Sequence, residues 1–337
     1  MRLAGLLRTA FCPALVATAI YWAGPMAASE IPTPSKPLAE AYQDLEQGEA
    51  DKALGLLGAQ PTSGTDAPLA SNLVCRVRYT LEQWDAAISA CEQAVELAGN
   101  DSDYHLWLGR ALGEKAARAS FLTAYSLAKR TRVEFEQAVE LDRRNAEALA
   151  DLGDFYRQAP GVLGGGIDKA RAVAIELDKV DVPRAEKLRG QIAEQQNDYA
   201  AAEAEYKMAT GSGPEQATGW VSLAGFYARR QRFDDMESAV HNIVGTQAHD
   251  KPGGVALYDG AGLLIETRRN LALAAQMLED YLSGSAKSEE APAFIAHMRL
   301  ARLKRQLGDP VAAGREQAAA QAMAHEYNPA QDEKTHR

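Results

Sequence analysis

The residues best suited to bind a ligand are cations that recur at a fixed spacing. Arg76 and Arg110 lie 34 residues apart in a chain of 337 residues whose net charge is −10. A guanidinium group donates two parallel hydrogen bonds to one carboxylate, so clustered arginines favour acidic ligands. We therefore expect an acidic or carboxylate-bearing partner, bound by Arg76, Tyr79, Arg110, Lys115, Arg118 and Arg157. The alternative is that these cations pair with acids of the chain itself, namely Asp103, Glu114 and Asp154.

Motifs for catalysis or metal binding are absent from the sequence. The segment from Gly161 to Gly166 lacks the Lys-Ser/Thr ending of a phosphate-binding loop and follows no predicted strand. The six histidines include no closely spaced pair of the metal-ligand type. No serine or cysteine lies in a nucleophile motif. We therefore predict no enzyme, no metal and no cofactor.

Paired helices must position the cations. Apolar residues recur at helical spacing on both sides of Glu82-Gln83, where there is room only for a tight turn. A small residue on each first helix is followed by another about twelve positions later, because closely crossing helices can present only small side chains to each other. These pairs are Ala41/Ala53, Cys75/Ala87, Gly190/Ala202, Gly262/Ala274 and Ala301/Ala313, with Ala224/Met236 as a larger variant.

The 34-residue period resembles that of the tetratricopeptide repeat (TPR) family, as do the segments from Trp220 to Tyr227 and from Leu149 to Tyr156, which are close to W-x2-L-G-x2-Y. The resemblance implies an all-α solenoid, a right-handed superhelix of about eight helical hairpins. It also implies that the first helices line a concave groove, into which the residue after each small crossing residue points. These groove positions are Arg76, Arg110, Asp154, Gln191 and Leu263.

Two consecutive repeats are longer than the period allows. In the third, the pattern Thr131, Phe135, Ala138 comes ten residues late, and in the fourth Gly153 pairs with Ala170 across a turn that is five residues too long. We predict both insertions in the turns within the hairpins, as spatial neighbours on one edge of the solenoid. The segment from Trp107 to Leu141 is also similar to part of the regulator of microtubule dynamics family, which implies a helical-repeat fold.

Cys75 and Cys91 are the cysteines expected in the mature chain. Cys75 lies at the crossing position, and Cys91 lies one turn after Ala87, so both face the seam between the two helices. In an exported protein we predict a disulfide between them. The alternative is two buried thiols that serve as small apolar side chains.

The chain begins like an exported protein. Residues 1–28 contain two arginines, an apolar run and small residues, which predicts a secretory signal peptide cleaved after Ala28 or Ser29. The mature protein would then be periplasmic or secreted. The alternative is an uncleaved membrane anchor, although a run of about 15 apolar residues is short of the roughly 20 that a span needs. We predict a proline-rich linker at 29–37, the TPR solenoid at 38–322 and a frayed polar tail at 323–337.

These features predict a non-enzymatic protein-protein interaction scaffold of the cell envelope, which binds a peptide or protein in its concave groove. The alternative is a helical-repeat enzyme or a small-ligand carrier, with a pocket beside the insertions in the third and fourth repeats. A closed pocket with converging buried charges would favour the alternative, and an open groove would favour the scaffold. Loss of Arg2 and Arg8 with the leader takes the net charge to −12, which argues against nucleic acid as a partner. We expect no stable membrane span after leader cleavage.

Overall fold

The computed structural model describes residues 34–59, 63–211, 216–246 and 250–327. In these residues the regular elements are sixteen α-helices and one short 3-10 helix, without any strand. The predicted all-α fold of about eight hairpins is confirmed. The predicted leader, most of the linker and residues 328–337 of the tail lie outside the described residues. The first helix begins at Lys36, inside the predicted linker, because a proline at position 37 is compatible with a helix's first turn.

Each hairpin consists of a first and a second helix. In chain order the hairpins are α1 (Lys36–Glu46) with α2 (Ala50–Gly58), α3 (Ala67–Thr80) with α4 (Trp84–Leu97), α5 (Ser102–Arg118) with α6 (Phe121–Leu141), α7 (Ala146–Gln158) with α8 (Ile167–Leu177), α9 (Val182–Gln195) with α10 (Tyr199–Met208), α11 (Gln216–Arg229) with α12 (Phe233–Gly245), α13 (Lys251–Glu266) with α14 (Leu271–Ser283), and α15 (Ala293–Gln306) with α16 (Pro310–Met323). The 3-10 helix η1 (Gly161–Leu163) lies between α7 and α8.

Most hairpins have the same kind of turn between their two helices. Three residues separate the two helices, and the middle one has a positive φ, as at Gly48, Glu82 and Gly308. That conformation reverses the chain at the end of a helix and is least strained at glycine. The turn between α13 and α14 is one residue longer, with Arg268 and Asn270 both at positive φ.

Small residues lie where the helices cross. A Cβ atom built on Gly109 would come within 2.5 Å of the Phe135 ring, so only glycine allows α5 and α6 to approach this closely. The predicted pair Gly262/Ala274 is wrong by one residue. Ala261 is the fully buried residue opposite Ala274, because the longer turn shifts the register, and Gly262 faces inward beside Arg299.

The seam between α3 and α4 carries a covalent bond. Cys75 and Cys91 form a disulfide, with their α-carbons 5.1 Å apart, and both residues are fully buried. The predicted bond is therefore present in the structure, and it fixes one hairpin of the array.

The third repeat has its extra residues inside its helices, so the predicted turn insertion is wrong there. α5 and α6 are extended, and only Ala119 and Ser120 separate them. The fourth repeat does carry its insertion in the turn, which includes η1. The two insertions are neighbours as predicted, since Gly164 beside η1 packs against the side chain of Arg132 on α6.

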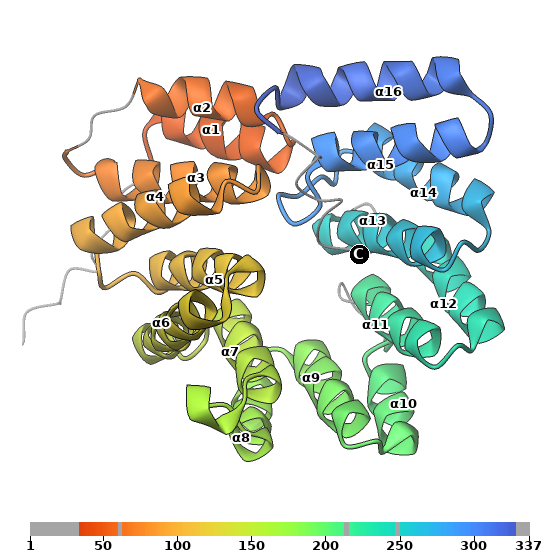
Figure 1. Ribbon diagram of the computed structural model, residues 1–337, viewed down its shortest axis with the longest axis horizontal. Coiled ribbons are helices and arrows are strands. Elements are labelled where there is room, and N and C mark those ends of the chain that lie inside the picture. Colours follow the sequence, from red (N-terminus) through yellow and green to blue (C-terminus); the bar gives the residue numbers. More distant parts are fainter. Residues whose placement is uncertain (1–33, 60–62, 212–215, 247–249, 328–337) are drawn as a thin grey trace, which may run out of the picture. The chain divides into compact units, whose positions relative to one another are not determined.

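Successive hairpins stack so that first helices lie beside first helices. Figure 1 shows α3, α5, α7, α9, α11 and α13 turned toward a common interior, with their second helices outside them. We call the surface that the first helices present to this interior the inner face. Asp or Asn side chains cap several of these helices, for example Asp101 on α5, Asn145 on α7 and Asp250 on α13.

The array turns back on itself, so that its first hairpins contact its last (Figure 1). One apolar cluster contains Leu38, Leu45 and Leu57 from the first hairpin together with Phe294 and Ala320 from the last. We call these contacts, with the ion pairs beside them, the closure interface.

The tail begins as part of this interface, so the predicted fraying from 323 is wrong for residues 324–327. Ala324 is buried, and the Tyr327 ring lies 5.0 Å from that of Phe294. Glu326 accepts hydrogen bonds from Arg78 and Gln83 on the second hairpin. The short polar segment is held because its apolar residues fill the interface and its acid meets a cation.

Candidate functional site

The inner face is hollowed into cavities of contrasting chemistry. One cavity, of about 670 Å³, is lined by residues of α1, α3, α5, α7, α9, α11 and α13 and by the loop of residues 284–292; we call it the arginine cavity. A second, of about 290 Å³, is lined by α9, α11, α13 and α15, and we call it the lysine cavity. Between them lies a cavity of about 330 Å³ that borders both Arg110 and Lys187. All five predicted groove positions line one or another of these cavities.

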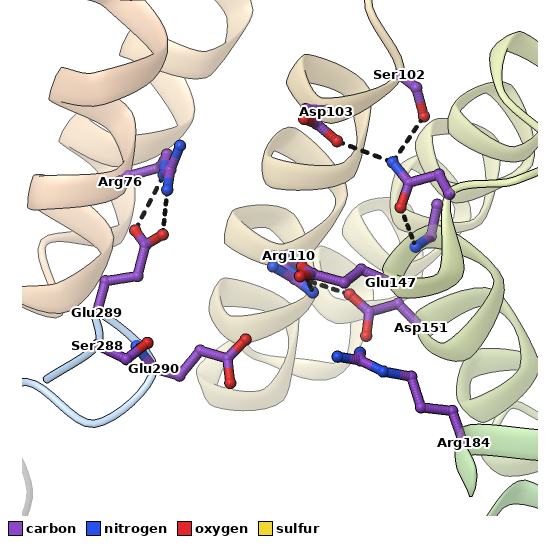
Figure 2. A network of polar contacts seen from close by, with 12 residues as sticks. Arg76, Ser102, Asp103, Arg110, Glu147, Asp151, Arg184, Ser288, Glu289 and Glu290 are labelled. Carbon is purple, nitrogen blue, oxygen red and sulfur yellow. Dashed lines mark hydrogen bonds and ion pairs between the residues drawn. The ribbon is translucent and has the colours of Figure 1, made fainter. Parts of the chain in front are cut away.

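Arg76 on α3 is the centre of the arginine cavity. Its guanidinium carbon lies 5.1 Å from the ring centroids of both Tyr42 and Trp107. Nε donates to Glu289 at 2.9 Å, and Nη2 donates to the other oxygen of the same carboxylate (Figure 2). Only 15% of the Arg76 side chain and 6% of the Glu289 side chain are exposed. This is a fork-shaped pair of the kind that holds a carboxylate, and the chain itself supplies the carboxylate.

Glu289 reaches Arg76 because the 284–292 loop is anchored in the interior. Tyr281 Oη donates to the carbonyl of Ala291 and accepts from the backbone N–H of Ser288 at 3.3 Å. Ser288 and Ala291 are buried. Figure 2 shows Glu290 pointing from this loop toward α5, without a dashed bond.

Arg110 on α5 is held by the next repeat. Its Nε donates to Asp151 at 2.6 Å and its Nη2 to Glu147 at 2.9 Å, both on α7 (Figure 2). Its guanidinium carbon lies 4.7 Å from the Trp107 ring centroid, on a ring that also faces Arg76. Burial lowers the pKa of Arg110, but the two carboxylates outweigh burial and raise it above its usual range. Arg110 therefore stays charged.

Tyr79 completes this group. Its ring meets those of Trp84 and Trp107 edge to face, with centroids 5.3 and 5.5 Å apart. Burial, followed by the charge of Glu114, raises the pKa of Tyr79 well above its ordinary value. The structure thus brings together three of the predicted residues, Arg76, Tyr79 and Arg110, around Trp107.

The other three predicted residues lie apart from this group. Lys115 pairs with Asp85 and Arg118 with Glu114, and neither lines the cavities of the inner face. The Arg118 guanidinium lies over the Trp84 ring instead, at 4.7 Å. Arg157 donates to Asp154 at 3.0 Å and lines a separate pocket with Glu194 and Arg229.

The predicted cations thus pair with acids of the chain, which is the alternative that the sequence left open. Glu114 and Asp154 were foreseen as partners, whereas Asp103 instead accepts from the Asn145 side chain at 2.8 Å. Sequence reasoning missed Glu289 and Trp107. Trp107 had a local signal, since it lies one turn before Arg110 on the same helix face. Glu289 had none, because 213 residues separate it from Arg76.

The lysine cavity has a different character. Lys187 on α9, Asp259 on α13 and Arg299 on α15 line it, and among the described residues none of the three forms an ion pair. The Arg299 guanidinium lies over the Tyr258 ring at 4.0 Å. Glu266 lines the same cavity two turns beyond Asp259.

A further cavity lies beside the insertions, and it is open to solvent rather than the closed pocket that would favour the alternative function. It has a volume of about 470 Å³ and lies between α5, α6, α7 and η1; we call it the insertion cavity. Phe135, Phe155 and Leu163 line it together with the polar residues Glu114 and Asp151. It shares Tyr79 and Arg110 with the group around Trp107.

Two searches of the described residues were negative. They contain no group of three or more His, Cys, Asp or Glu side chains that could hold a metal ion. No helix among them is long and apolar enough to cross a membrane.

The helices pair, repeat and stack in the way that the 34-residue period predicts. The described residues form an array of eight stacked helical hairpins. No family model and no curated protein matches the chain. Among solved structures it is similar to a thermophilic TPR protein of Thermus thermophilus, with 19% identity, a TM-score of 0.48, and coverage of 56% of this chain and 96% of that one. It is also similar to a TPR protein of Parabacteroides merdae, with 12% identity, a TM-score of 0.44, and coverage of 80% and 97%.

Proposed function

We propose that this protein is a non-enzymatic interaction scaffold of the cell envelope that binds an extended segment of a protein partner on its inner face. The observation that carries the proposal is that consecutive first helices line adjoining polar cavities along one surface. A solenoid surface of this kind suits an extended chain, because each repeat adds side chains at a regular step.

The envelope location rests on the predicted leader, and the disulfide between Cys75 and Cys91 supports it, because such bonds persist in oxidising compartments. We expect N-terminal sequencing of the mature protein to begin near Ser29 or Glu30. Recovery of an intact Met1 from membrane-bound protein would instead indicate an uncleaved anchor.

A photo-cross-linking amino acid tests the binding surface. We would place it at Gln191 or Leu263 on the inner face and, as matched controls, at Ile175 or Val311, which are 63% and 72% exposed on second helices. In envelope extracts the inner positions should capture a defined polypeptide that the outer positions do not. Equal capture at all four positions, or none at the inner ones, would contradict the proposal.

A preference for acidic partners stays a prediction. An acidic segment would have to replace Glu289 at Arg76, and Glu147 and Asp151 at Arg110. The charge reversal Arg76→Glu with Arg110→Glu should abolish capture at Gln191 if the partner's acids bind here. Unchanged capture in a folded double variant would show that the arginine cavity is not the site.

A second candidate function is that of a small-ligand carrier. The insertion cavity and the contact between the first and last hairpins support it. A volume of about 470 Å³ between apolar rings and polar groups fits a small-ligand carrier. The arginine cavity is a poorer candidate for this small-ligand site, because its converging charges already pair with one another. Native mass spectrometry of protein purified from the envelope should then show a bound small molecule, lost in the cavity-filling variant Ala128→Phe. Absence of any bound mass from the wild-type protein would remove this candidate.

A further inference from the structure

Almost every cation of the inner face has an acidic partner. In addition to Arg76 and Arg110, Arg229 donates two hydrogen bonds of 2.8 Å to Glu194, and Lys251 pairs with Glu46. The lysine cavity is the exception, because Lys187, Asp259 and Arg299 line one space without an ion pair among the described residues. Lys187 and Asp259 are exposed to solvent and Arg299 is half-buried, so all three charges are accessible to a ligand that enters the cavity.

The three charges remain apart because of where their helices hold them. Each comes from a different first helix, and Arg299 is fixed over the Tyr258 ring at 4.0 Å. Glycines keep the space between them open. A Cβ atom on Gly262 would lie 3.3 Å from an Arg299 nitrogen, and one on Gly225 would lie 3.2 Å from an Arg229 nitrogen. Larger residues at these two positions would narrow the cavity.

Asp259 is exposed to solvent in the cavity, although much of the surrounding space is filled by protein. This crowding raises the pKa of Asp259, and the positive charges of Arg299 and Lys187 lower it. Both cations therefore act on the same carboxylate through space without bonding to it. A ligand that enters between them would meet both signs of charge.

We propose that the lysine cavity binds a small zwitterion, an amino acid or a short peptide with free ends, whose carboxylate pairs with Lys187 and Arg299 and whose ammonium group pairs with Asp259. The volume of about 290 Å³ lies just below the range of drug-sized ligand sites, about 300–1,000 Å³, which suits a ligand as small as an amino acid. Binding supplies each unpaired group with its counter-charge. The inference goes beyond the scaffold role and does not depend on it.

Equilibrium dialysis of the full mature chain tests the proposal. The protein is dialysed against an equimolar mixture of the twenty amino acids and, separately, against a random tripeptide mixture with free ends. Mass spectrometry identifies what the protein retains. Retention from the first mixture indicates a free amino acid as the source, and retention from the second alone indicates a peptide. No retention from either mixture would overturn the proposal.

Blocked forms of the retained compound test the charges. N-acetylation removes the ammonium group and C-terminal amidation removes the carboxylate, and each should weaken binding at least about tenfold. Binding that is indifferent to both changes would overturn the proposal.

Variants tie the binding to this cavity. Asp259→Asn should abolish the penalty of N-acetylation, and Lys187→Met with Arg299→Met should abolish that of amidation. Asp168→Asn and Lys179→Met, on exposed residues outside the inner face, serve as matched controls with unchanged binding. Circular dichroism and thermal unfolding verify that each variant is folded. Unaltered binding by folded Asp259→Asn would place the ligand elsewhere and contradict the inference. Capture of a protein at Gln191 remains a separate outcome, so the two proposals can fail independently.

Discussion

Two groups of charges on the inner face differ in how they are paired, although Arg229, which also lines the lysine cavity, pairs with Glu194. In the N-terminal half, on α3, α5 and α7, Arg76 and Arg110 are stacked on aromatic rings and bonded to carboxylates. In the C-terminal half, on α9, α13 and α15, Lys187, Asp259 and Arg299 share a cavity without bonding to one another. Charge content alone therefore does not identify a binding surface in this fold. Charged residues that have no ion-pair partner within the chain are better candidates for binding a ligand.

The difference has a local cause in each half. Glu147 and Asp151 lie one turn apart on α7 and face Arg110 of the preceding repeat, while the 284–292 loop carries Glu289 to Arg76. In the C-terminal half, glycines occupy inner positions, at Gly225 and Gly262, and bring no counter-charge. The pair of Arg76 with Glu289 thus joins distant repeats and the pairs of Arg110 join neighbouring ones, whereas Lys187, Asp259 and Arg299 form no such ion pairs among the described residues.

Removal of Arg76 is the change with the largest expected effect. Arg76→Met leaves Glu289 buried without its partner, which should lower the free energy of unfolding by about 3–5 kcal/mol. Arg229→Met is the matched change in the other half. Because more than half of the Arg229 side chain is exposed, its loss should cost less than about 1 kcal/mol. Urea unfolding measures both.

A double variant separates the effect of the unpaired Glu289 charge from the effect of replacing the Arg76 side chain. Arg76→Met with Glu289→Leu removes both charges, so it should recover most of the stability that Arg76→Met loses. Equal losses in Arg76→Met and Arg229→Met would show that the two halves do not differ in this way.

The sequence predicts the features that repeat locally. Helix pairing and the seam shared by Cys75 and Cys91 follow from periodicity within one or two repeats, and the inward direction of Arg76 and Gln191 is what the TPR resemblance implies. The long α5 and α6 were misread as a turn insertion, because a helix-compatible segment does not reveal that the turn is confined to Ala119 and Ser120.

Contacts between distant repeats could not be predicted in this way. The closure interface joins the first and last hairpins, and the ion pair of Arg76 with Glu289 spans 213 residues. Each repeat rotates slightly on its neighbour, so the curvature that closes the array accumulates over many interfaces. No single motif encodes it. The ion-pair partners of the inner face are set by this curvature and therefore have no signature in the local sequence.

Loss of the disulfide should have the next largest effect, because it fixes a hairpin of the N-terminal half. Cys75 and Cys91 are 16 residues apart, and a loop of that size predicts a loss of about 3 kcal/mol on removal. Cys75→Ala with Cys91→Ala tests this, since alanine is the usual crossing residue of the other repeats. Wild-type protein under reducing conditions should show the same loss of stability in urea unfolding. Equal stability of oxidised and reduced protein would contradict the prediction.

Glycine-to-alanine substitutions compare how tightly side chains pack around Gly109 and around Gly262. Gly109→Ala places a methyl group 2.5 Å from the Phe135 ring and should cost about 1–3 kcal/mol through overpacking. Gly262→Ala meets only the mobile end of Arg299 at 3.3 Å, so the gain in helix propensity, up to about 1 kcal/mol, should offset any crowding. Thermal unfolding of the two variants checks this contrast. A larger loss at Gly262 would mean that the lysine cavity is more tightly packed than described.

The smallest expected effect on stability is that of Asp259→Asn. The prediction is whether the variant is more or less stable than the wild type. Burial raises the pKa of Asp259 from 3.8, so the folded state binds this proton more tightly than the unfolded chain. Its contribution to stability is present below about pH 4 and is lost as the pH rises through the raised value. Asp259→Asn removes that loss, so at neutral pH the variant should be slightly more stable than the wild type, by less than about 0.5 kcal/mol because solvent screens this exposed side chain. The gain should vanish in acid, where both side chains are neutral. Urea unfolding from pH 3 to pH 8 measures it, with Asp168→Asn as the exposed control. A variant that is less stable at neutral pH would show that Asp259 has a stabilising partner in the folded protein, and the contrast between the two halves would then fail.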